Sequence, residues 1–187
     1  MIKSILILFF VTCTVFAQER QYSEPSKFIQ KSTYVQINMN ENEKTLFKSG
    51  FNENVSFYPS EIINIKENTK LYGLAIENTY MRVNPELPET IAKETAWVAM
   101  DEIADLIVWF ETYVAPNINE EVYDKKAIQY IFNAKEITFK YEIVNNRQIF
   151  TVIFNNSYFK DKYFWTQSRV KDIPNILKTL KYLQTKK

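Results

Sequence analysis

The chain has 187 residues and balanced charge, with 23 basic and 22 acidic side chains and a formal net charge of +1. This balance opposes a general role in binding nucleic acid or anionic membranes. Because the sequence contains no histidine, it excludes a Ser-His-Asp triad, a Cys-His dyad and the usual zinc sites of His and Cys ligands. Two glycines cannot build a nucleotide-binding loop, so we expect no cofactor and no metal.

The first 17 residues have the features of a secretory signal peptide. Lys3 provides a positive charge, the apolar stretch 5–11 is too short to span a bilayer, and Ala17 ends a suitable cleavage site. We therefore expect cleavage after Ala17, a mature chain of residues 18–187, and a periplasmic or extracellular location. The alternative is a lipoprotein acylated at Cys13, although a bulky residue precedes this cysteine.

In the first half of the mature chain, a flexible leader over residues 18–28 is expected to precede a series of strands rich in β-branched and aromatic residues. The polar segment 84–89 is predicted to be an inserted loop. The last strand leads into an amphipathic helix at about 101–114, for which Asp101 is the candidate N-cap. The predicted strands cover residues 34–40, 55–58, 62–66, 71–80 and 95–99.

The second half begins with a polar linker at Pro116 and ends with a helix at about 172–185, whose candidate N-cap is Asp172. Asn145 and Asn146 are expected to form a hairpin turn. With so few glycines, the other turns must also depend on Asn, Asp and Pro. The predicted strands cover residues 127–133, 136–144, 148–154 and 162–167.

The two halves resemble each other, which indicates an internal duplication. Segment 71–80 matches segment 149–158, and the apolar positions of the two helices follow the same spacing. We predict an α+β fold of two tandem repeats, residues 29–115 and 116–187, packed as a single compact unit. Each repeat would contain about four antiparallel strands followed by one helix. The matching helix positions are Ile103, Leu106, Ile107, Phe110 and Tyr113 in the first repeat and Ile173, Ile176, Leu177, Leu180 and Leu183 in the second.

This outline resembles the double strand-and-helix repeats of the Whirly and Pur-type nucleic-acid-binding folds. The stretch from Trp97 to Ile107, which leads into the first helix, resembles small exported proteins of unknown function from Gram-negative bacteria. The resemblance implies location and architecture but no activity, and it transfers no functional residue. Balanced charge and export oppose a nucleic-acid partner.

An aromatic cluster at residues 158–165 contains the candidate ligand-binding side chains Tyr158, Tyr163 and Trp165. Neighbours on a strand point to opposite faces, so Tyr163 and Trp165 would share one face. Exposed aromatic rings on a sheet can stack against sugar rings or peptide side chains. Packing in the core is the competing interpretation.

Two oxygen-rich clusters have alternative interpretations. Carboxylates in the first turn of the first helix are candidates for glycoside hydrolysis, although acidic residues there also complement the helix dipole. A second cluster offers oxygen ligands for calcium but lacks the EF-hand pattern, so a solvated turn competes with that reading. The first cluster is Asp101, Glu102 and Asp105, and the second is Asn38, Asn40, Glu41 and Glu43.

Charge is distributed unevenly, because the charged residues of segment 86–124 are mostly acidic and those of segment 157–187 are mostly basic. We interpret this as pairing between the two helices, either within the fold or across a homodimer. The leading functional hypothesis is an exported, non-catalytic binding or interaction module of the cell envelope, whose partner is an unknown protein or glycan. The alternatives are a carbohydrate-binding protein that uses an exposed aromatic sheet face, and a carboxylate-dependent glycoside hydrolase.

Overall fold

The computed structural model describes residues 21–48, 53–84, 87–118, 127–144, 147–155 and 172–186. Within these ranges the chain is a compact α+β fold with two antiparallel sheets, as the sequence predicted. The predicted signal peptide, residues 1–17, and the aromatic cluster at residues 158–165 lie outside the described residues. None of the described helices combines the length and apolar character that a bilayer-crossing helix needs.

The larger sheet has the strand order β1 (Val35–Met39), β3 (Asn54–Asn64), β4 (Thr69–Asn84) and β5 (Leu87–Ala99), and β2 (Thr45–Lys48) also pairs with β3. β1 and β2 pair with successive parts of one edge of β3.

Pro59 explains why β3 can be continuous where the sequence predicted two shorter strands, 55–58 and 62–66. It lies between the part of β3 that pairs with β2 and the part that pairs with β1. Its carbonyl oxygen accepts a hydrogen bond from the Asn40 N–H at 2.9 Å, so its ring nitrogen faces the same gap between the two strands. A proline there removes no ladder hydrogen bond.

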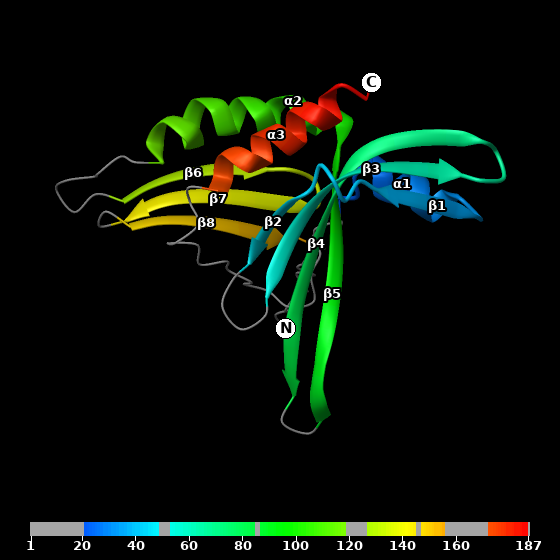
Figure 1. The fold of residues 1–187 in the computed structure, drawn as a ribbon, viewed down its shortest axis with the longest axis horizontal. Coiled ribbons are helices and arrows are strands. Elements are labelled where there is room, and N and C mark those ends of the chain that lie inside the picture. The colour runs from blue at the N-terminus through cyan, green and yellow to red at the C-terminus, as the bar shows by residue number, and fades with distance from the viewer. Residues whose placement is uncertain are drawn as a thin grey trace, which may run out of the picture.

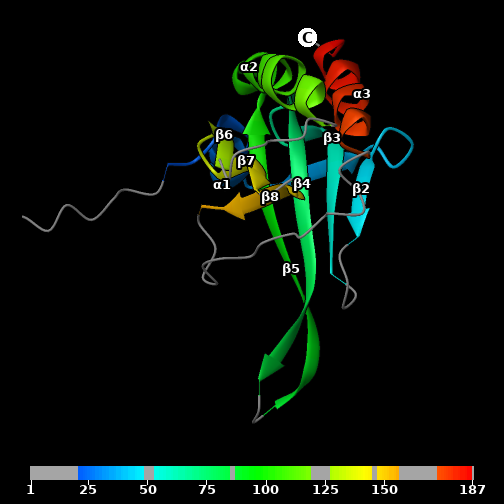
Figure 2. The ribbon, with the colours of Figure 1, turned by 90° about the vertical axis from the view of Figure 1, so that its left-hand side faces the viewer.

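β4 and β5 form a long hairpin that projects away from the rest of the molecule (Figures 1 and 2). The expected loop at residues 84–89 is wrong, because β4 continues to Asn84 and β5 begins at Leu87. Asn84 pairs with Leu87, so both residues belong to the strands of the hairpin.

The smaller sheet consists of β6 (Ala127–Asn133), β7 (Ile137–Val144) and β8 (Arg147–Phe154), and its strands run across those of the larger sheet (Figure 2). All three match predicted strands closely. The two sheets meet through stacked rings, with the centroids of Phe57 and Phe139 6.3 Å apart.

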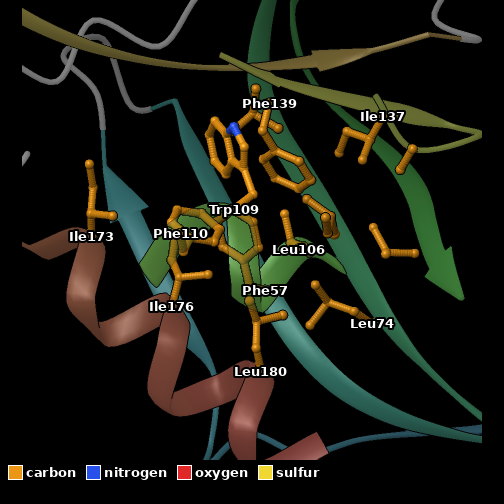
Figure 3. Close-up of a cluster of buried hydrophobic side chains, with 14 of the residues drawn as sticks. Phe57, Leu74, Leu106, Trp109, Phe110, Ile137, Phe139, Ile173, Ile176 and Leu180 are labelled. Carbon is orange, nitrogen blue, oxygen red and sulfur yellow. The ribbon is translucent and has the colours of Figure 1, made fainter. Parts of the chain in front are cut away.

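Two helices complete the main core. α2 (Met100–Trp109) continues into a π-helical segment, Phe110–Val114, and packs beside α3 (Ile173–Gln184), as Figure 1 shows. Figure 3 shows how side chains from both sheets and both helices interdigitate, including Trp109 and Leu180. Burial of this apolar surface is the main stabilising contribution that a chain of this composition can make.

The starts of the two helices differ in part from the prediction. α2 begins directly after Ala99, so Asp101 lies in its first turn and is not the N-cap. Asp172 does occupy the N-cap position of α3, although its side chain makes no capping hydrogen bond. Five described strands precede α2 and three precede α3, so the two-repeat organisation stays a prediction.

A short helix, α1 (Glu24–Lys31), overlaps the second half of the segment 18–28, where the sequence predicted a flexible leader. It packs on the face of the larger sheet opposite the main core, against a small cluster that contains Tyr58 and Trp97. Gly73 permits this close approach, because a Cβ at that position would lie 2.8 Å from Cγ of Pro25.

Candidate binding cleft

A cleft of about 260 Å³ lies where the carboxyl-terminal end of α3 meets the larger sheet. Figure 1 shows the end of α3, marked by the label C, near β3. The cleft combines polar, charged and aromatic side chains from β1, β3, β4 and the end of α3. Its lining residues are Asn38, Met39, Asn40, Pro59, Ser60, Glu61, Tyr72, Tyr182, Leu183 and Lys186.

The floor of the cleft includes a row of three side chains on adjacent strands. Asn38 of β1 lies opposite Glu61 of β3, and Glu61 lies opposite Tyr72 of β4. Directly opposite residues in an antiparallel pair point to the same face, so the register places all three side chains together.

Hydrogen bonds hold this row in place. Glu61 Oε1 accepts from the Tyr72 hydroxyl at 2.9 Å and from Lys70 Nζ at 3.2 Å. Glu61 Oε2 accepts from Asn38 Nδ2 at 3.2 Å. The Tyr72 hydrogen bond, followed by those from Asn38 and Lys70, lowers the pKa of Glu61. Hydrogen bonds to Tyr72 and Glu61 raise the pKa of Lys70, so both groups stay charged at neutral pH.

The wall of the cleft comes from Tyr182 and Lys186 at the end of α3. Asn40 Nδ2 donates to the Tyr182 hydroxyl at 2.9 Å, and the Lys186 ammonium lies 4.7 Å from the centroid of the Tyr182 ring. Asn40 is oriented in turn by its Oδ1, which accepts the backbone N–H groups of Asn42 and Glu43. These hydrogen bonds form a turn that begins at Asn40. Such a turn was the alternative to a calcium site when the sequence was interpreted.

Two threonines fix the position of α3 relative to the sheet. The hydroxyls of Thr45 on β2 and Thr179 on α3 lie 2.7 Å apart, and both residues are buried. The Thr179 hydroxyl also donates to the Glu43 carbonyl at 2.7 Å. A buried hydroxyl without a partner is costly, so these hydrogen bonds favour a single position of α3 relative to the cleft floor.

The candidate catalytic carboxylates lie elsewhere and have structural partners. Glu102 accepts the backbone N–H groups of Ala99 and Lys135 at 3.1 and 2.8 Å, and Asp101 forms an ion pair with Lys135 at 3.2 Å. Asp105 is exposed. Neither Asp101, Glu102 nor Asp105 lines this cleft.

The proposed calcium ligands are only partly brought together. Asn38 and Asn40 both line the cleft, whereas Glu41 forms an ion pair with Lys44. Across the part of the chain that the structure describes, no three His, Cys, Asp or Glu side chains are grouped as metal ligands would be.

Charge pairing between the helices is present within the chain. Lys181 of α3 forms an ion pair with Glu111, in the π-helical continuation of α2, at 2.5 Å. A homodimer through these helices stays a prediction. So does ligand binding by Tyr158, Tyr163 and Trp165, which lie outside the described residues.

The sequence missed Glu61, Tyr72 and Tyr182 as site residues. It singled out Asn38 and Asn40 as oxygen ligands and noted Lys186 as part of a basic terminus. Comparison with protein-family models, with curated proteins and with solved structures gave no match.

Proposed function

We propose that the protein is an exported, non-catalytic binding module of the cell envelope that takes its ligand in the cleft at the end of α3. The observation that carries this proposal is the hydrogen-bonded row of Asn38, Glu61 and Tyr72. Its polar groups are already oriented by one another and by the strand register. Preorganised groups bind with a smaller ordering cost, which favours recognition at this place.

The protonation states of the cleft support binding over catalysis. A general acid or base needs a pKa near the working pH. Hydrogen bonds shift the pKa of Glu61 downward and that of Lys70 upward, so both move away from neutrality. These two groups are therefore suited to fixed charge and hydrogen bonding, and not to proton transfer.

Export is proposed from the sequence and can be tested directly. The protein would be expressed from its full-length gene in a Gram-negative host, followed by fractionation and determination of its mass and amino terminus. We expect a periplasmic or secreted protein that begins at Gln18. A cytoplasmic protein that retains Met1 would contradict export, and a lipid-modified amino terminus at Cys13 would replace secretion with membrane anchoring.

Binding can be tested by measuring the thermal midpoint of the mature protein against envelope glycans, peptidoglycan fragments, short peptides, divalent metals and single-stranded DNA. A ligand at about a hundred times its dissociation constant adds about 2.7 kcal/mol, which raises the midpoint by a few degrees.

The variants Tyr72→Phe and Glu61→Gln should reduce the midpoint shift, because they remove groups of the cleft floor. Tyr34→Phe is the matched control, since Tyr34 is 63% exposed and does not line the cleft. A shift that survives both cleft variants would place the ligand elsewhere. The absence of a shift with every compound would count against a binding module.

A further inference from the structure

The unused hydrogen-bonding groups of the cleft indicate the chemistry of its ligand. The Tyr182 hydroxyl accepts from Asn40, and its own proton has no acceptor among the described residues. The Lys186 ammonium lies over the Tyr182 ring, and no described carboxylate is within ion-pair distance of it. A neutral donor and a cationic donor therefore remain close together at the end of α3.

Among the described residues that line the cleft and its neighbouring opening, the charged side chains are Glu61, Lys70 and Lys186, which leave one positive charge uncompensated. Lys70 is offset by Glu61, with which it forms an ion pair at 3.2 Å. Lys186 is the cation that remains. A phenol and an ammonium beside each other match the two oxygens of a carboxylate through charge-assisted hydrogen bonds. Nucleic acid would require a longer run of cations to match its phosphates.

The remainder of the site suits a ring that carries several hydroxyl groups. Glu61 accepts three hydrogen bonds and still has acceptor capacity, because an ionised carboxylate offers about four positions. Beside it lies the half-buried Tyr72 ring, which packs against the main core and has Lys70 Nζ 5.4 Å from its centroid. The part of the ring that stays exposed is apolar surface. A peptide, by contrast, is usually held by a free sheet edge or by a row of apolar pockets. The floor here is the face of a sheet, and its row of side chains is polar.

The cleft also continues beyond one ring. A neighbouring opening of about 560 Å³ is lined by Tyr72 and Lys186 as well as by Lys70, Leu71, Met100 and Thr185. Because the two openings share Tyr72 and Lys186, a ligand in the first can extend across Tyr72 into the second. This arrangement favours a short chain of units over a single small molecule.

We propose that the cleft binds a saccharide that carries a carboxylate. The Tyr182 hydroxyl and the Lys186 ammonium bind the carboxylate, Glu61 accepts from a ring hydroxyl, and the ring lies against Tyr72. This inference rests on the proposed function and names the ligand class of the same site.

The test compares charged and uncharged forms of the same sugar. Trimers of galacturonic acid and of glucuronic acid, and their methyl esters, are titrated into the mature protein by isothermal calorimetry. We expect at least one acid to bind about tenfold more tightly than its ester, the effect of one charge-assisted hydrogen bond. Lys186→Gln should lower the affinity for the acid to that for the ester. Lys178→Gln is the matched control, since Lys178 is an exposed residue of α3, the helix that ends just before Lys186, and does not line the cleft.

The outcomes separate the ligand class from the proposed function. Equal affinity for acid and ester, or an unchanged preference in Lys186→Gln, would overturn the carboxylate assignment while leaving a binding cleft. If no sugar binds but another compound gives a midpoint shift that Tyr72→Phe removes, the ligand class is wrong and the proposed function stands. If no compound of either panel binds, both fail.

Discussion

Glu136 joins three parts of the fold, and its replacement tests how they are held together. The residue lies in the turn between β6 and β7 and is 5% exposed. One oxygen accepts from Ser23 N at 2.7 Å and from Ser23 Oγ at 2.5 Å, and the other accepts from Trp97 N at 3.1 Å. This carboxylate therefore connects the N-cap of α1 to the edge of β5 and to the smaller sheet.

Glu136→Gln keeps the shape of the side chain but replaces one acceptor oxygen with an amide donor. At least one backbone N–H, of Ser23 or Trp97, then faces another N–H while buried. A lost hydrogen bond to a charged group costs about 1.5–3 kcal/mol, and an unsatisfied buried donor about 1–3 kcal/mol. We expect the free energy of unfolding to fall by about 3 kcal/mol, a large part of the 5–15 kcal/mol typical of a domain.

Urea denaturation measures this change, and hydrogen exchange of the Trp97 amide locates it. The midpoint should fall at constant slope, and the Trp97 amide should lose protection. Glu67→Gln is the control, because Glu67 lies in an exposed turn and should change stability by less than about 0.5 kcal/mol. A Glu136→Gln protein as stable as this control would refute the reasoning.

Three further predictions use other contacts of the fold. Gly73→Ala places a Cβ 2.8 Å from Pro25 Cγ, and we expect urea denaturation to show a loss of about 1–3 kcal/mol that is partly recovered in a Pro25→Ala background. Because the folded pKa of Glu61 lies below its ordinary value of 4.5, its contribution to stability is present above the unfolded pKa and is lost as pH falls through the folded pKa. The thermal midpoint should therefore fall more steeply between about pH 5 and pH 3 in the native protein than in Glu61→Gln, and identical curves would contradict this. Phe139→Ala removes a fully buried ring that contacts Phe57 and Phe150, which should cost about 3–5 kcal/mol in the free energy of unfolding.

The elements predicted most accurately have local patterns that agree with their burial. In β7 the residues alternate between buried and half-buried positions along the whole strand, which is the period-two pattern used to predict it. In α3 the buried positions Ile173, Ile176, Leu180 and Leu183 follow the helical spacing. These patterns can be recognised without knowing what the element packs against.

The mispredicted elements depend on contacts distant in sequence. In the sequence alone, Pro59 predicts a break between two strands. The strand continues because Pro59 lies beside the gap between β1 and β2, which only the structure reveals. The segment 84–89 contains prolines and polar residues that favour a loop, yet the paired strands of the β4–β5 hairpin continue through most of it. Helix α1 is only 8 residues long, too short to be stable alone, and it depends on its docking against the sheet and on Glu136.

The cleft is harder to predict than any of these elements, because its floor is produced by register. Glu61 by itself is an ordinary half-exposed carboxylate on a strand, and the segments around Asn38 and Tyr72 give no sign that these residues meet it. A shift of one residue in either pairing would move Asn38 or Tyr72 to the opposite face. The wall of the cleft depends separately on the threonine contacts that hold α3 against the larger sheet. These contacts join residues more than 130 positions apart in sequence. The site is therefore a consequence of two long-range alignments, and no motif within a single segment could have identified it.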